Sequence, residues 1–304
     1  MKQNALKTAH GKRAAYVSNQ RPLLWLLPLF VVLLAFFLVP TLDVIRLSFT
    51  NASLAKPSYD YTTKSYLKVI RDSAFPEIMS VTLIFVSISV VFQFLLGFVI
   101  AYCVDKGEKY RLRGTVAVRT ISLVSWAIPG VAIGIIWKIM YAENAGGILN
   151  YLLSLLGFGQ VAFLSDPNTA IFSVCLANIW RGTAQSMILL YSGLKTVPAD
   201  VLEAADVDGA SNWRKIVSVT IPSMKSVITV NILLNIINTF NTFDMIMPLT
   251  GGGPGHSTEV LVLGAYRTIF QQLDMGKGCA MAVILLCINV FFSLIYIRAG
   301  KEED

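Results

Sequence analysis

Residues 195–222, with the sequence KTVPADVLEAADVDGASNWRKIVSVTIP, form a polar segment between two long apolar runs. The pattern predicts two short helices in this segment. Pro198 suits a first helical turn, and Glu203 follows it where the helix dipole favours acidic residues. Gly209 suits the left-handed conformation that closes a helix, and Ser211 is expected to cap the next one.

The acidic residues of this segment indicate which way it faces. They are Asp200, Glu203, Asp206 and Asp208. Because an anionic membrane surface repels acidic side chains, we expect the segment to project toward water or a partner protein. Val201, Leu202 and Ala205 give it a small apolar patch, and Glu203 is placed to pair with a basic residue of a partner. The alternative interpretation is a solvated connector between two helices.

On both sides of this segment the chain is dominated by apolar runs. It is 55% hydrophobic and 14% charged, which argues against a water-soluble domain. A membrane-spanning helix needs roughly 20 mainly apolar residues. We therefore predict an all-α polytopic membrane protein, with six spans at approximately residues 22–42, 78–104, 115–141, 170–194, 227–249 and 278–297. The first run follows a basic stretch but lacks a signal-peptide cleavage site, so we keep it as an uncleaved span.

Lysine and arginine are distributed unevenly between the loops. The N-terminus and the loops at 105–114 and 195–225 are basic, whereas residues 142–168 contain neither residue type. Since cytoplasmic loops carry the excess of positive charge, we expect both termini in the cytoplasm. The expected organisation is a cytoplasmic tail at 1–21, a first span at 22–42, an extracytoplasmic loop at 43–74, a core of five spans at 75–297 and a cytoplasmic tail at 298–304.

The residues that carry most enzyme chemistry are sparse. His10 and His256 are far apart in the sequence, and the four cysteines fall in apolar stretches without a CxxC pair. We therefore predict neither a metal centre nor a catalytic site. The net charge of +7 comes from basic residues that punctuate apolar runs, which is not typical of a nucleic-acid-binding face. We interpret Glu259, Arg267 and Asp274 as solvated loop charges.

One predicted span carries a polar stripe. Asn231, Asn235, Asn238 and Thr242 recur at the spacing of one helical face. Amide and hydroxyl groups both donate and accept hydrogen bonds, which suits the hydroxyl groups of a sugar. Such residues also join helices to one another inside membranes, and the stripe alone does not decide between these two roles.

The polar segment resembles the EAA loop of bacterial ABC-importer permeases. The similarity rests on Glu203-Ala204-Ala205, Gly209-Ala210 and the ending Val219-Thr220-Ile221-Pro222. Ser165-Asp166-Pro167, Asn178-Ile179-Trp180-Arg181-Gly182 and Leu249-Thr250-Gly251-Gly252-Gly253-Pro254 further resemble the carbohydrate branch of that family, in its larger maltose-type and glycerol-phosphate-type subunits. The resemblance implies a type I importer permease fold, in which the EAA loop is a coupling helix that docks on the ATPase.

The resemblance also implies partners and a cargo. These are a second homologous permease, two ATPase subunits, an extracytoplasmic binding protein and a neutral or acidic sugar-like solute, in the bacterial inner membrane. The chain lacks a GxxxxGK[ST] motif, so ATP and Mg²⁺ are expected on the ATPase and no cofactor or enzymatic activity on this chain. An ion-coupled secondary transporter is the alternative function.

Residues for two sites follow from the resemblance. The expected substrate-binding residues are Trp126, Gly130, Arg181, Gly182, Gln185, Asn235, Asn238, Thr239, Asn241 and Thr242. The expected ATPase-coupling residues are Val201, Leu202, Glu203, Ala204, Ala205, Asp208 and Gly209. A buried guanidinium needs a partner, so Arg181 is expected either to pair with Asp244 or to bind an acidic group of the solute.

Overall fold

The computed structural model describes residues 22–144 and 146–301. The expected tail at 1–21 and residues 302–304 of the second tail lie outside the described residues. The described chain is helical, and its β pairing consists of isolated bridges between Thr50 and Tyr61 and between Ser53 and Lys56. It divides after Arg46 into two compact units, which we describe separately.

The first unit holds an almost wholly apolar helix. It comprises α2 (Pro22–Leu33), a π-helical segment (Leu34–Leu38) and α3 (Val39–Ser48), whose last residues lie in the second unit. Its large apolar side chains are exposed, as those of a lipid-facing helix are expected to be. The helix continues to Ser48, beyond the predicted end of the first span at residue 42.

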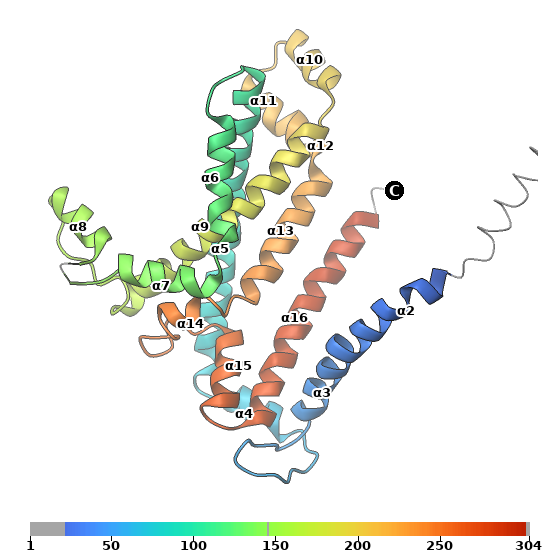
Figure 1. Cartoon of the computed structure of the whole chain (residues 1–304), viewed down its shortest axis with the longest axis vertical. Coiled ribbons are helices and arrows are strands. Elements are labelled where there is room, and N and C mark those ends of the chain that lie inside the picture. The colour runs from blue at the N-terminus through green and yellow to red at the C-terminus, as the bar shows by residue number, and fades with distance from the viewer. Residues whose placement is uncertain (1–21, 145, 302–304) are drawn as a thin grey trace, which may run out of the picture. The chain divides into compact units, whose positions relative to one another are not determined.

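The described part of the second unit contains three long helices, α5, α9 and α16, and several shorter ones (Figure 1). The helices are α4 (Lys64–Arg71), α5 (Phe75–Lys109), α6 (Thr115–Ala127), α7 (Gly130–Met140), α8 (Ile148–Leu155), α9 (Pro167–Thr196), α10 (Ala199–Val207), α11 (Asn212–Lys215), the π-helical segment Ile216–Thr220, α12 (Ile221–Ser223), α13 (Lys225–Phe240), α14 (Ile246–Leu249), α15 (Leu261–Phe270) and α16 (Met275–Lys301).

Three helices of the described chain are long and apolar enough to cross a membrane by themselves, and two broken helix pairs raise that number to five. The three are Trp25–Ser48, Phe75–Lys109 and Met275–Arg298. The fourth predicted span is α9, a single helix of 30 residues that is less apolar because it carries Asn178, Arg181 and Gln185. All six predicted runs therefore coincide with helical segments.

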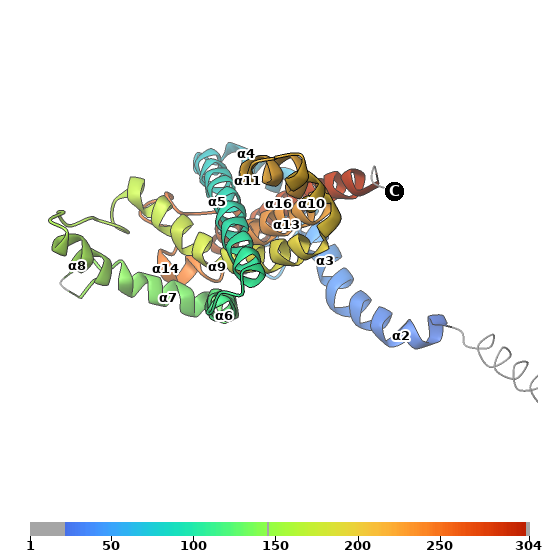
Figure 2. The same cartoon turned by 90° about the horizontal axis from the view of Figure 1, so that it is seen from above.

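Two of the predicted spans are interrupted in the structure. The third is broken into α6 and α7, which meet at 101°. Ile128 has an extended backbone because it precedes Pro129, and Pro129 itself lacks the N–H that would continue the helix. Within the fifth predicted span, α13 ends at Phe240 and α14 begins at Ile246. A further bend of 77° at Met224, two residues after Pro222, lies just before the predicted start of this span at residue 227. Figure 2 shows α7 and α8 extending sideways from α6.

The core lies where α5 packs along α9 and where α7, α13, α14, α15 and α16 meet them. Phe85, Ile133 and Tyr141 are fully buried there. The Tyr141 hydroxyl donates a 2.9 Å hydrogen bond to the carbonyl of Ser173, which satisfies a polar group inside the core. The Gln93 amide of α5 donates a 2.9 Å bond to the carbonyl of Asn178, so a polar contact also joins α5 to α9.

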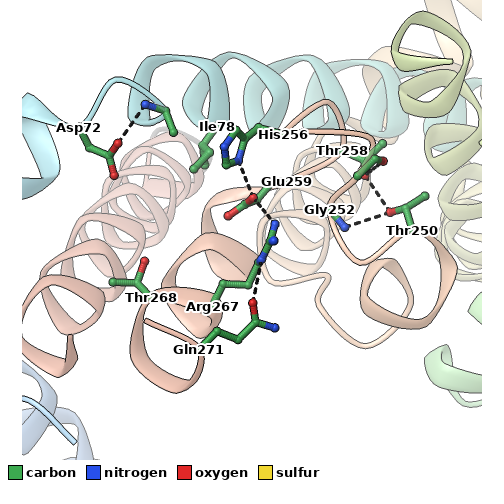
Figure 3. A network of polar contacts seen from close by, with 12 residues as sticks. Asp72, Ile78, Thr250, Gly252, His256, Thr258, Glu259, Arg267, Thr268 and Gln271 are labelled. Atoms are coloured by element: carbon green, nitrogen blue, oxygen red, sulfur yellow. Dashed lines mark hydrogen bonds and ion pairs between the residues drawn. The ribbon is translucent and has the colours of Figure 1, made fainter. Parts of the chain in front are cut away.

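The end of the unit opposite α10 is held by a buried ion-pair network (Figure 3). Glu259 is buried, its Oε2 lies 2.6 Å from Arg267 Nη1 and 2.7 Å from His256 Nδ1, and Arg267 Nε donates to Gln271. The interpretation of Glu259 as a solvated charge was therefore wrong. The hydroxyl groups of Thr250 and Thr258 form a 2.7 Å hydrogen bond with each other. This bond closes the glycine-rich turn between them, just before α15 begins.

Two further ion pairs hold α16 at this end. Asp274 pairs with Lys68 of α4 at 2.6 Å, so it too has a partner in the protein. The Lys277 ammonium donates a 2.6 Å hydrogen bond to Asp72, just after α4. That bond, more than any other contact, holds the pKa of Asp72 below its ordinary value, against the opposing effect of burial.

We predict that Asp72→Asn destabilises the protein at neutral pH by about 1 kcal/mol, as loss of a partly exposed ion pair does. Because the folded-state pKa of Asp72 is lowered, its stabilisation is present above the unfolded-state pKa and is lost as pH falls through the folded-state pKa. The thermal midpoints of the variant and the wild type in detergent should therefore converge in acid. Glu77→Gln, which changes an exposed carboxylate nearby, serves as the control; an equal loss there would contradict the assignment.

Candidate functional sites

A polar cavity of about 370 Å³ lies between α5, α6, α9 and α13. Its volume falls within the roughly 300–1,000 Å³ that is usual for ligand pockets. Amides, hydroxyls and one ion pair line it in a part of the chain where polar side chains are otherwise rare. The lining residues are Gln93, Trp126, Asn178, Arg181, Gly182, Gln185, Asn235, Asn238, Thr239, Asn241, Thr242 and Asp244.

An ion pair connects two walls of this cavity. Arg181 of α9 donates from Nη1 to Asp244 Oδ1 at 2.9 Å and from Nη2 to Oδ2 at 3.0 Å. Asp244 follows α13, so the pair joins the two helices in a bidentate arrangement, the strong form of this contact. The structure thus contains the pairing of Arg181 that was one of the two sequence-based alternatives.

Two glycines leave room for these polar groups. A Cβ at Gly130, the first residue of α7, would overlap the Asp244 carboxylate. The carboxylate therefore also lies at the positive end of the α7 dipole. A Cβ at Gly182 would overlap the side-chain amide of Gln93 in the same way.

Polar side chains of α9 and α13 hydrogen-bond to one another beside the cavity. Asn238 Nδ2 donates to Gln185 Oε1 at 3.0 Å, and Asn235 Nδ2 donates to Ser186 Oγ at 2.7 Å. Each primary amide has two N–H donors and a carbonyl acceptor, so Asn238 and Gln185 keep unused capacity on the cavity side. The polar stripe of α13 thus both joins helices and lines a cavity.

The predicted substrate-binding residues gather at this cavity. Trp126, Arg181, Gly182, Gln185, Asn235, Asn238, Thr239, Asn241 and Thr242 line it, and Gly130 lies behind Asp244. Gln93 and Asn178 were missed as lining residues. Each is a polar residue among apolar neighbours in a predicted span. Such residues tend to face a bundle interior, and this pattern could have identified both as lining residues.

The second site is the segment at 195–222, which the structure places at the opposite end of α9 from the ion-pair network (Figure 1). It forms α10, α11 and α12, with Gly209 in the left-handed region at φ +72°. Ser211 Oγ accepts from the Arg214 backbone N–H at 3.3 Å and caps α11, as predicted.

The predicted coupling residues lie on α10 and the turn that follows it. Val201, Glu203, Ala204, Asp208 and Gly209 are exposed, whereas Leu202 and Ala205 are half-buried. Val207 and Trp213 are also exposed, at 88% and 74%, and they enlarge the apolar surface of this tip beyond the predicted patch. Among the described residues, Asp206 is held in an ion pair by Lys215, while Glu203 has no ion pair.

Lys195 joins this segment to α5. Its ammonium lies 2.8 Å from Asp105 Oδ1 and 2.9 Å from Glu108 Oε2, and Lys109 lies 2.9 Å from the other oxygen of Asp105. The Tyr191 hydroxyl donates to Glu108 at 2.6 Å. The residues immediately before α10 are therefore fixed to the end of α5 by several charged contacts.

The helical bundle, the polar cavity and the projecting loop define a membrane transport subunit. The family described as "Binding-protein-dependent transport system inner membrane component" matches residues 93–298. The chain belongs to this family.

Curated relatives extend the similarity over most of the chain. The trehalose/maltose transport system permease protein MalF of Thermococcus litoralis is 32% identical over 279 residues, which cover 91% of this chain and 92% of that protein. The sulfoquinovosyl glycerol transport system permease protein SmoG of Agrobacterium fabrum is 29% identical, with 92% and 90% covered.

Solved structures have the same fold. A bacterial ABC transporter that imports the acidic polysaccharide alginate aligns with a TM-score of 0.75 at 21% identity, with 97% of this chain and 99% of that chain covered. The alginate transporter in complex with a pentasaccharide-bound periplasmic protein gives 0.78 at 19% identity, with 96% of each chain covered. None of these similarities supports the ion-coupled alternative.

The contact between Asn238 and Gln185 generates a prediction about transport. Asn238→Leu keeps the helix and the side-chain volume but removes hydrogen-bonding groups from the cavity, so solute uptake should fall about tenfold, the loss expected for one hydrogen bond. Uptake kinetics in reconstituted vesicles measure the effect. Thr229→Val, on the same helix outside the cavity, is the matched control. Normal kinetics for Asn238→Leu would mean that the stripe serves packing alone.

Proposed function

We propose that this chain is the permease subunit of an ATP-driven importer that carries a sugar or sugar-like solute across the bacterial inner membrane. It pairs with a second, homologous permease, two ATPase subunits and an extracytoplasmic binding protein. ATP and Mg²⁺ are bound by the ATPases. The chain itself forms no covalent intermediate and needs no cofactor.

The cavity between α9 and α13 is the single observation that carries the sugar assignment. Sugars present hydroxyl groups that donate and accept, and the lining amides and hydroxyls do both. Trp126 is 57% exposed on the last turn of α6 and offers an apolar ring face. The named cargoes of the relatives, trehalose, maltose and sulfoquinovosyl glycerol, are carbohydrates, which supports the same substrate class.

The lining of the cavity is suited to weak binding of a solute. Its lining contains neutral groups and one internally neutralised ion pair, so binding rests on hydrogen bonds that exchange readily with water. A transporter benefits from this because the solute must also leave. The second permease would supply the facing wall.

The tip formed by α10 is the proposed docking surface for the ATPase. Its exposed small and apolar residues permit close approach of another protein, and Glu203 remains available for a basic partner residue. Movement of the docked ATPase would pass through Lys195 to α5 and α9, which both line the cavity. Rigid-body displacement of these helices is the proposed means of alternating access.

The positive-inside pattern supports an orientation in which α10 lies in the cytoplasm. The basic loop at 105–114 and the α10 segment share one end of the unit, as the contact between Lys195 and Asp105 requires. The network around Glu259 then faces outward, where the binding protein docks. In this orientation α16 ends toward the cytoplasm.

We predict that Glu203→Lys weakens ATPase docking without preventing membrane insertion. Reversal of an exposed charge at a protein interface places like charges together, and it should reduce co-purification of the ATPase about tenfold. Glu77→Lys is the matched control. It makes the same charge reversal at an exposed residue in the first turn of α5, at the end of that helix far from α10. Equal recovery of the ATPase with both variants would count against the coupling role of α10.

A further inference from the structure

The charges of the cavity lining cancel. Among the described lining residues, Arg181 and Asp244 are the charged ones, and they pair with each other in the bidentate contact of 2.9 and 3.0 Å. All other lining residues are neutral amides, hydroxyls, a tryptophan and a glycine. The net charge offered to a solute is therefore zero.

This ion pair faces the cavity rather than the protein interior. The side chain of Arg181 is 28% exposed and that of Asp244 is 41% exposed. The guanidinium uses two N–H groups on Asp244, which leaves further donors, and the carboxylate oxygens each keep lone pairs. A hydroxyl group can therefore bind across the pair as both donor and acceptor without breaking it.

The Asp244 carboxylate is held in place beside Arg181. Its carboxylate lies against the first residue of α7, where a Cβ would overlap it. The α7 dipole and the guanidinium both stabilise its negative charge there. An incoming anion would have to displace this carboxylate or lie beside a guanidinium whose charge the carboxylate already neutralises.

We propose that Asp244 sets the charge selectivity of transport, so that the cavity accepts uncharged sugars and disfavours carboxylated or similarly anionic ones. This inference rests on the proposed function and names the substrate class of the same site. Asp244 forms the ion pair with the Arg181 guanidinium, which would otherwise bind an anion. The site therefore disfavours acidic solutes.

The fold itself leaves this choice open. The solved transporters that share it import alginate, an acidic polysaccharide, at 21% and 19% sequence identity to this chain. Cargo charge is therefore a property of individual residues. In this chain the residues that decide it are Arg181 and Asp244.

The test measures solute binding to the assembled transporter in nanodiscs without the binding protein, so that the selectivity of that protein does not enter. The probes are trehalose and the monocarboxylate made by oxidising one primary hydroxyl of trehalose. Saturation-transfer NMR titrations give the dissociation constant of each. Wild type, Asp244→Asn and the double variant Arg181→Gln/Asp244→Asn are compared, the double variant being the control in which both charges are removed.

We expect wild type to bind trehalose at least tenfold more tightly than the carboxylate. Asp244→Asn frees the guanidinium, and it should shift the ratio of the two constants toward the carboxylate by about ten- to hundredfold, since hydrogen bonds to charged groups are the stronger ones. The double variant should bind trehalose more weakly than wild type does but should return the ratio to the wild-type preference. High salt should diminish the gain in Asp244→Asn.

Three outcomes would overturn the proposal. They are equal binding of both probes by wild type, an unchanged ratio in Asp244→Asn, and a gain that persists in the double variant. The wild-type comparison stands even where Asp244→Asn fails to assemble. Absence of binding for both probes in wild type would instead remove the proposed sugar cavity itself, which distinguishes failure of the proposed function from failure of the charge selectivity.

Discussion

The structure depends on one constraint, which is that polar groups inside a membrane must find their partners within the protein. Hydrocarbon offers no hydrogen bonds, so the backbone of a spanning segment forms helices. Polar side chains gather for the same reason. Polar side chains of α9 and α13 hydrogen-bond to each other beside one cavity, and the backbone carbonyl of Asn178 accepts from Gln93. The site follows from the concentration of these groups in one place.

Charge is used differently at the two ends of the second unit. Around Lys195, the buried carboxylate of Asp105 and the partly exposed charges beside it connect the start of the projecting loop to α5. Around Glu259, a buried carboxylate holds the glycine-rich turn and α15 together (Figure 3). Between these ends lies the Arg181 and Asp244 pair, in contact with the cavity. In the proposed function, the first connection transmits motion, the second stabilises the outer surface and the third contacts the solute.

Much of this organisation could be predicted from the sequence, because long apolar runs and a distinctive polar loop leave few alternatives. The capping role of Ser211 and the left-handed Gly209 follow from residue types that serve few other purposes. The substrate-binding roles given to the cavity residues stay predictions, although the structure brings the residues together. Pro129 interrupts the hydrogen bonding of the third span, which we did not predict, and the sequence gives neither the 101° angle between α6 and α7 nor the close approach of Gly130 to Asp244. The burial of Glu259 could not be predicted from the sequence either. Its contacts with Arg267 and His256 form only when the turn folds back onto α15.

The most direct test of the account is solute uptake into proteoliposomes that contain this chain with its partner subunits. Uptake of a labelled neutral disaccharide is measured with ATP supplied to the ATPase side, and separately with an imposed proton gradient and no ATP. The account predicts uptake that requires ATP and added binding protein and that a proton gradient does not replace. Uptake driven by the proton gradient in the absence of the ATPase would contradict it.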